Sequence, residues 1–261
     1  MATDLIAVLV LAFVQGITEW LPVSSSGHLV LLEQVTGFSG GGLELNVAVH
    51  FGTLLAVFVY FRNDIGKIVG SWLRGKVGQE HGKLGWFIVL GTIPAAIVGY
   101  FWRDVFAAAF QSLETVALGF AVTGVLLMVA SRPLRRERKL RVGSALTVGL
   151  AQVLALIPGV SRSGMTISTG MLSGMKEKEA LRFSFLLAIP IILGANILVG
   201  EGWAWTWQAA VGAFVAFLVG LGTIHLLYGR ILRDRANLKW FGLYALVLAA
   251  VTFLVSLGVF G

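Results

Sequence analysis

Two broken stretches of sequence decide the fold of this 261-residue chain. The first reads Leu21-Pro22-Val23-Ser24-Ser25-Ser26-Gly27, and the second reads Ile157-Pro158-Gly159-Val160-Ser161-Arg162-Ser163-Gly164. Proline removes a backbone donor and clashes with the preceding helical turn, and Ser or Gly then suits the cap of a new helix. We therefore expect residues 4–36 and 143–174 each to form two half-helices joined by a polar turn.

The rest of the chain is strongly apolar. Hydrophobic residues make up 57% of the sequence and charged residues only 13%, whereas a soluble domain carries about 25% charged residues. The absence of cysteine excludes disulfides and thiolate metal sites. We expect an all-α polytopic membrane protein with the two broken regions as re-entrant hairpins. Its six transmembrane helices, each close to the length that spans hydrocarbon, are predicted at 45–61, 84–101, 113–131, 181–200, 208–228 and 240–260.

The basic residues support this topology. If the six spans cross the bilayer and the two hairpins do not, 18 of the 20 Lys and Arg residues fall on one face. Arg103 falls on the other face, and Arg162 lies in the second broken turn. Such a bias marks the cytoplasmic side, so the sequence predicts cytoplasmic basic loops and external termini.

The two halves of the chain share one order of elements, because each is a broken hairpin followed by three spans. Pro22 and Pro158 stand at equivalent places. We expect a single membrane domain, 1–261, made of inverted repeats 1–131 and 143–261 joined by a basic cytoplasmic loop, 132–142. Inverted repeats place a site near the bilayer midplane, where discontinuous helices meet.

Gln15 and Glu19 are four residues apart and share one helix face. A carboxylate at membrane depth is costly, so Glu19 marks a functional site by default; the alternative is a residue hydrated near the interface. Mg²⁺ is often held by one or two carboxylates together with substrate phosphates. Glu19, with Gln15, is therefore a candidate metal site.

The serine cluster after Pro22 offers an anion site. Ser24, Ser26 and Gly27 supply caps and exposed amides at a helix N-terminus, which suits a phosphate, although capping alone would also explain the serines. His28 could be a buried structural histidine. Beside the serines and a buried glutamate, it is a better candidate for acid–base chemistry.

Arg162 lies in an apolar setting and needs an anionic partner. Its guanidinium matches phosphate oxygens, and the structural alternative is a resting pair with Glu19. Ser161, Ser163 and Thr166 add hydroxyl donors at the same half-helix start. If the two hairpins face each other, this set suits a diphosphate whose apolar tail lies between helices.

These motifs resemble the bacterial undecaprenyl-diphosphate phosphatase family, the integral-membrane enzymes linked to bacitracin resistance. The resemblance rests on Gln15–Glu19, Leu21–His28, Pro158–Thr166 and Phe183–Pro190. It implies hydrolysis of undecaprenyl diphosphate to undecaprenyl phosphate and inorganic phosphate. That reaction recycles the lipid carrier for cell-wall synthesis.

By motif position, the resemblance implies that Glu19 is the essential carboxylate and Arg162 the phosphate clamp. Ser25 is then the leading nucleophile candidate, and His28 is a general acid–base or a rival nucleophile. The resemblance also implies dependence on Mg²⁺ or Ca²⁺ and an active site that opens outward. One departure is Gln15, where relatives often carry Glu, which shifts the weight of any metal site to Glu19.

A lipid-phosphate transporter or flippase is the alternative function, because inverted repeats with broken helices are common in transporters. The serines and His28 beside Glu19 favour an enzyme, because a carrier needs anion donors but no nucleophile. The expected partners are a polyprenyl diphosphate and the bilayer of the bacterial inner membrane. A homodimer is left open, and no nucleic acid is expected.

Overall fold

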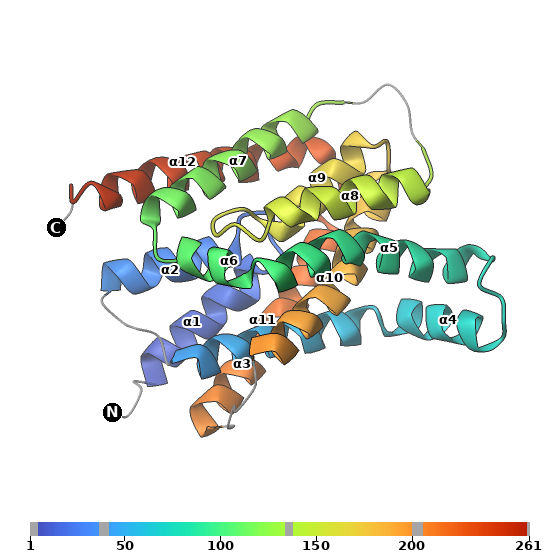
Figure 1. Ribbon diagram of the computed structural model, residues 1–261, viewed down its shortest axis with the longest axis horizontal. Helices are drawn as coiled ribbons and strands as arrows, with labels where there is room; N and C mark the ends of the chain where they lie inside the picture. The colour runs from blue at the N-terminus through green and yellow to red at the C-terminus, as the bar shows by residue number, and fades with distance from the viewer. Residues whose placement is uncertain (1–4, 37–41, 134–137, 200–205, 260–261) are drawn as a thin grey trace.

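The computed structural model describes residues 5–36, 42–133, 138–199 and 206–259. Every regular element in these ranges is helical (Figure 1), which confirms the all-α prediction. The helices are α1 (Leu5–Thr18), α2 (Ser25–Thr36), α3 (Gly42–Tyr60), α4 (Arg62–Leu73), α5 (Glu80–Phe101), α6 (Arg103–Ala109), α7 (Leu113–Ala130), α8 (Val142–Leu154), α9 (Arg162–Leu172), α10 (Glu177–Val199), α11 (Trp207–Gly229), the 3₁₀ turns η1 (Ile231–Arg233) and η2 (Arg235–Asn237), and α12 (Leu238–Ser256).

Five helical stretches in the described residues are long and apolar enough to cross a bilayer. They contain α5, α7, α10, α11 and α12, and each coincides with one of the predicted spans. The chain is therefore a polytopic membrane protein. The predicted basic loop extends beyond the described residues at 134–137, the predicted span 181–200 at residue 200, and the last predicted span at residue 260.

The sixth predicted span, 45–61, corresponds to α3 and ends differently from the prediction. The chain bends by 73° between α3 and α4, and only the two helices together pass as a span by length and hydropathy. The predicted spans 45–61 and 84–101 leave residues 62–83 as a connection, whereas 62–73 are helical. The reason is that α4 is amphipathic, with Ile65, Ile68 and Trp72 at helical spacing between polar residues.

Both predicted helix breaks are present. The chain leaves helical geometry between Thr18 and Ser25 and again between Leu154 and Arg162. Gly159 has a φ of +85°, and a Cβ atom there would lie 2.1 Å from the carbonyl oxygen of Val116 in α7. Only glycine combines that conformation with that close approach.

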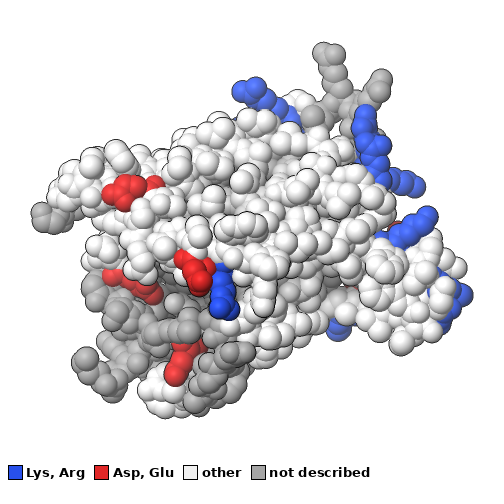
Figure 2. Space-filling view, viewed as in Figure 1, with Lys and Arg blue, Asp and Glu red and all other residues white. Residues whose placement is uncertain are grey.

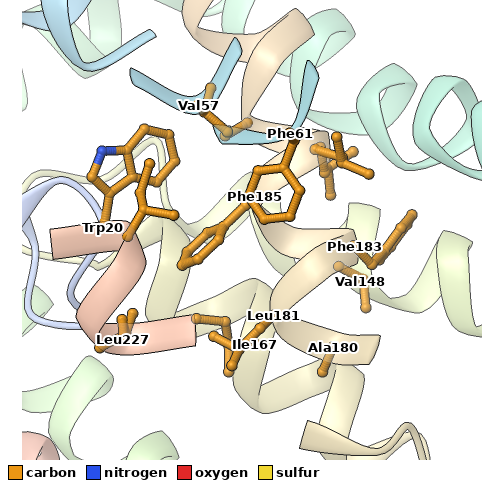
Figure 3. Packing of buried hydrophobic residues seen from close by; sticks show 14 of the residues in the cluster. Trp20, Val57, Phe61, Val148, Ile167, Ala180, Leu181, Phe183, Phe185 and Leu227 are labelled. Atoms are coloured by element: carbon orange, nitrogen blue, oxygen red, sulfur yellow. The ribbon is translucent and has the colours of Figure 1, made fainter. Parts of the chain in front are cut away.

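The core beside the first break is aromatic. Trp20, which follows Glu19, is fully buried, and its ring meets the edge of Phe185 at 5.3 Å between centroids. Phe61 contacts the same Phe185 ring (Figure 3). Such aromatic pairs contribute about 1 kcal/mol each beyond the area they bury. The core thus holds the backbone of the first break against α3 and α10.

Small residues allow the closest helix contact near this core. A Cβ atom at Gly52 in α3 would lie 2.1 Å from the carbonyl oxygen of Ala213 in α11, and Ala48 and Ala209 pack in the same contact. Glycine and alanine are common where membrane helices approach closely. α11 also packs against α1, so this contact helps to place the first hairpin.

We expect Gly52→Ala to lower stability by roughly 1–3 kcal/mol, because the added methyl group meets backbone that can move only if α3 and α11 separate. The control is Gly222→Ala in α11, where a Cβ atom would meet nothing within 4 Å. That variant should be neutral or slightly stabilising, because alanine is the better helix former. Thermal unfolding in detergent measures both, and equal midpoints would contradict the tight contact.

Candidate active site

Glu19 is the centre of the polar cluster between the two breaks. Its side chain is buried, and its two carboxylate oxygens bind different partners. Oε2 accepts hydrogen bonds from Gln15 Nε2 at 2.9 Å and from Ser25 Oγ at 2.6 Å. Oε1 accepts from Arg162 Nη2 at 2.6 Å. The predicted carboxylate, serine and arginine are therefore in direct contact, although Arg162 is 143 positions from Glu19 in the chain.

Arg162 is held from two sides. Nη2 pairs with Glu19, and the guanidinium carbon lies 5.5 Å from the centre of the Trp20 ring, an arrangement that stabilises a cation. Nη1 is buried and has no hydrogen-bond partner among the described residues. Leaving a charged donor without a partner is costly. Arg162 thus keeps one donor ready for an anion.

The second turn is anchored by hydroxyl groups. Ser161 Oγ accepts from the Gly164 amide at 3.0 Å and caps α9, while the Ser161 amide donates to Thr123 Oγ1 in α7 at 2.9 Å. Ser163 Oγ donates to the Leu21 carbonyl at 2.8 Å. This last bond joins the two broken turns directly. The structure therefore gives Ser161 and Ser163, both predicted to bind phosphate, an anchoring role.

Thr166 lies one turn further along α9. Its Oγ1 donates to the carbonyl of Arg162 at 2.9 Å and lies 2.6 Å from Ser184 Oγ in α10. Both hydroxyls are buried. Thr166 thus fixes the start of α9 against α10, and in the described contacts it does not reach Glu19 or Ser25.

The first turn has a similar cap. Ser24 has a φ of +68°, and its Oγ accepts from the Gly27 amide at 3.3 Å. Ser26 Oγ lies 3.2 Å from Ser24 Oγ. A Cβ atom at Gly27 would lie 2.5 Å from the Phe120 ring, so close packing explains the glycine, and its amide, predicted to be exposed, is buried and used by Ser24. Ser25 is the serine whose hydroxyl reaches Glu19.

His28 has partners away from Glu19. Its Nδ1 lies 2.7 Å from the Ser24 carbonyl, and its Nε2 lies 2.8 Å from the Tyr244 hydroxyl of α12. Because a carbonyl only accepts, Nδ1 carries the proton, and in the neutral ring Nε2 accepts from Tyr244. The two rings stack at 5.7 Å. The structure brings His28 to the same turn as Ser25, but it joins Ser25 directly to Glu19 and not to His28.

Sequence reasoning missed three residues of this cluster. Tyr244 is 216 positions from His28, and Thr123 contacts a turn 38 positions away. His50 was not among the predicted site residues, yet its Nε2 lies 3.8 Å from Glu19 Oε2. The only indication for His50 in the sequence was that a polar residue lies within a predicted span. No local pattern indicated Tyr244 or Thr123.

The residues predicted to hold a metal ion offer few ligands of their own. No group of three or more His, Asp or Glu side chains converges among the described residues. Gln15 Oε1 is, however, a buried oxygen without a partner in the described contacts, and it lies on the amide that binds Glu19. One carboxylate and one amide oxygen fit a hard cation whose remaining ligands come from a substrate or water.

The chemistry of the cluster follows from these contacts. A buried carboxylate accepts the hydrogen of a serine hydroxyl, which is the arrangement that activates an oxygen nucleophile. A guanidinium with a free donor lies beside the same carboxylate, where it can bind an anion. The site can therefore bind a phosphate group and present a nucleophile to it.

Comparison with known proteins agrees with this chemistry. Residues 8–251 match the family described as "Bacitracin resistance protein BacA". A protein of Teredinibacter turnerae named "Undecaprenyl-diphosphatase" is 42% identical over 96% of this chain and 99% of its own length. Proteins with the same name from Alteromonas mediterranea and Rubrobacter xylanophilus are each 39% identical over 95% of this chain and 97% of their own length. The chain therefore belongs to the BacA family.

Proposed function

We propose that this chain hydrolyses undecaprenyl diphosphate to undecaprenyl phosphate and inorganic phosphate. The observation that carries the proposal is the direct contact of Ser25, Glu19 and Arg162, which brings a nucleophile, a base and an anion clamp together from two distant turns. Relatives that match nearly the whole chain are named for this reaction. The same contact is also what phosphoryl transfer requires, since positioning and charge stabilisation supply most of the catalysis.

In the proposed reaction, Arg162 binds the terminal phosphate through the donor that Glu19 leaves free. Glu19 Oε2 takes the hydroxyl proton of Ser25, and Ser25 Oγ attacks the terminal phosphorus. The bond from that phosphorus to the bridging oxygen breaks, and undecaprenyl phosphate leaves. Water then attacks the phosphorus of the phosphoserine and the bond from phosphorus to Ser25 Oγ breaks. Ser25 takes its proton back from Glu19, and inorganic phosphate is released together with one proton of the water. We retain His28 as the rival nucleophile or acid–base and direct attack by water as the alternative route.

A divalent cation, Mg²⁺ or Ca²⁺, is part of the proposal. Glu19 and Gln15 Oε1 would hold it, with the substrate phosphates completing its shell. When bound, the ion would neutralise charge on the phosphate oxygens. Gln15 itself orients the Glu19 carboxylate through its amide hydrogen bond.

We also propose that the protein lies in the bacterial inner membrane with basic loops inside, termini outside and the site opening outward. The view in Figure 2 supports this: most of the visible Lys and Arg side chains gather at one end, and the visible Asp and Glu side chains lie toward the other. The described ends of α1 and α12 lie at the acidic end (Figure 1). The bias matches the positive-inside rule. A homodimer stays a prediction, which the mass of the detergent-solubilised protein would test.

The re-entrant hairpins and inverted repeats are likewise our proposal. Helices that hold the same place in each half make equivalent contacts: α1 packs against α11, as α8 packs against α5, and α7 packs against α12. Exchanging the two halves converts the first contact into the second. The half-helices α1 and α8 are each shorter than a span, which supports hairpins that enter and leave on one side.

Phosphate release tests the hydrolase. We expect detergent-purified protein to release phosphate from a prenyl diphosphate with Mg²⁺ or Ca²⁺ and to lose that activity with chelator. Arg162→Lys should lower kcat/KM by about a hundredfold, because an ammonium cannot bind Glu19 and phosphate in the geometry of the guanidinium fork. Arg230→Lys, at an exposed arginine, should change little. Absence of release from folded protein under every metal condition would favour the lipid-phosphate transporter.

Ser25→Ala distinguishes a hydrolase from a lipid carrier, and it tests whether Ser25 or His28 is the nucleophile. The variant should lose at least about a hundredfold in phosphate release, because the nucleophile is gone, while a carrier would still move lipid. Ser26→Ala removes a neighbouring hydroxyl that contacts only Ser24 in the described structure, and it should retain most activity. Full hydrolysis by Ser25→Ala would exclude Ser25 and promote His28.

Tyr244→Phe tests whether Tyr244 acts through His28. The variant keeps the ring stack and removes one hydrogen bond, which should lower kcat by about threefold to tenfold. In a His28→Ala background the same change should have no further effect, because the partner is absent. Steady-state kinetics of the four proteins measure this, and equal losses in both backgrounds would assign Tyr244 to packing alone.

A further inference from the structure

A second polar feature lies outside the site described above. A groove of about 700 Å³ lies between α4 and the start of α5, and residues 62–81 alone supply its walls. None of these residues belongs to either helix break. Its lining contains four cationic side chains, from Arg62, Lys67, Arg74 and Lys76.

The positive charge of this groove is not balanced by the protein. Glu80 is the single carboxylate of the lining. Asp64, the acidic residue of α4, pairs instead with Arg182 of α10. Lys67, Arg74 and Lys76 form no ion pair with any residue that the structure describes. A cleft lined by charge of one sign concentrates ions of the opposite sign, so the groove favours an anion.

The backbone leaves room for that anion. Gly66 and Gly70 are one helical turn apart on the lined face of α4, between Arg62 and Arg74. A Cβ atom at either glycine would meet nothing within 4 Å. His81 Nδ1, at the opposite wall, is buried without a hydrogen-bond partner among the described residues. The groove thus has open space along α4.

The other face of α4 is apolar. Val69, Trp72 and Leu73 are exposed, and Trp72 packs against Trp86 of α5 with 5.6 Å between ring centroids. The Trp72 indole donates to the Gly82 carbonyl at 3.0 Å. Tryptophan is enriched at membrane interfaces, and a bent-off amphipathic helix with a basic face typically lies in that plane.

We propose that this groove binds the phosphate of an anionic phospholipid from the leaflet at the basic end of the protein. The exposed apolar side chains of α4, Val69 and Leu73, would lie among acyl chains, and its basic face would hold the head group. Basic pockets between membrane helices recognise lipid head groups in this way. The site is separate from the proposed catalysis, and its variants should release phosphate at the wild-type rate.

Binding of short-chain lipids to the full-length protein in neutral detergent tests the proposal. Calorimetric titration would compare dihexanoyl phosphatidylglycerol, dihexanoyl phosphatidylcholine and inorganic phosphate. We expect the anionic lipid to bind most tightly. The double variant Lys67→Gln with Arg74→Gln should lower the affinity for the anionic lipid about tenfold or more. The matched control, Arg138→Gln with Lys139→Gln, removes two exposed charges outside the groove and should change affinity less than about twofold.

A second pair of variants fills the groove without changing its charge. Gly66→Leu with Gly70→Leu should also weaken the anionic lipid about tenfold, whereas Gly143→Leu, which likewise meets nothing within 4 Å, should not. Thermal unfolding checks that each variant is folded. If the control variant at Arg138 and Lys139 lowers lipid affinity equally, the effect is general electrostatic attraction, and the proposed site is wrong. Unchanged affinity in the filled groove would also overturn it, and inorganic phosphate binding as tightly as lipid would overturn the lipid assignment.

Discussion

Backbone groups inside a membrane must find hydrogen-bond partners within the protein, and this constraint shapes both helix breaks. An unsatisfied amide or carbonyl in hydrocarbon costs several kcal/mol. Here the partners come from hydroxyl side chains. Ser163 donates to the Leu21 carbonyl, Thr123 accepts from the Ser161 amide, and Ser24 caps α2. One of these bonds joins the two turns directly and the others fix each turn in place, so the hydroxyl groups that satisfy the backbone also bring Glu19 and Arg162 together.

These backbone hydrogen bonds also determine which polar side chains remain available to bind a ligand. Ser161 and Thr166 are engaged in holding α9 in place, so they supply rigidity more than binding. Ser25 and Arg162 are the groups that face Glu19. A site in which the supporting hydroxyls fix the backbone and only a few groups face the ligand is preorganised, and preorganised charges need no rearrangement during reaction.

Local chemistry made the helix breaks, five of the spans and a pairing of Glu19 with Arg162 predictable, whereas the hydrogen bond from Ser25 to Glu19 was not predicted. Proline followed by serine and glycine has a direct effect on the backbone, and a buried carboxylate demands a partner. The bend before α4 was not predictable from hydropathy, because Phe61 continues the apolar run of α3. Tyr244 and Thr123 were missed because their partners are far away in sequence, and only helix packing brings them close.

The ion pair between Glu19 and Arg162 has a consequence for turnover. Oε1 holds Nη2 and leaves Nη1 without a partner among the described residues, so in the proposed reaction the phosphate binds beside the carboxylate and does not replace it. A diphosphate ester carries about three negative charges at neutral pH, whereas each product carries about two or fewer. Because Glu19 binds Arg162 through Oε1 and Ser25 through Oε2, it can act on the serine without releasing the arginine. The carboxylate also offsets part of the positive charge of Arg162, and we expect this to weaken product binding and to limit product inhibition.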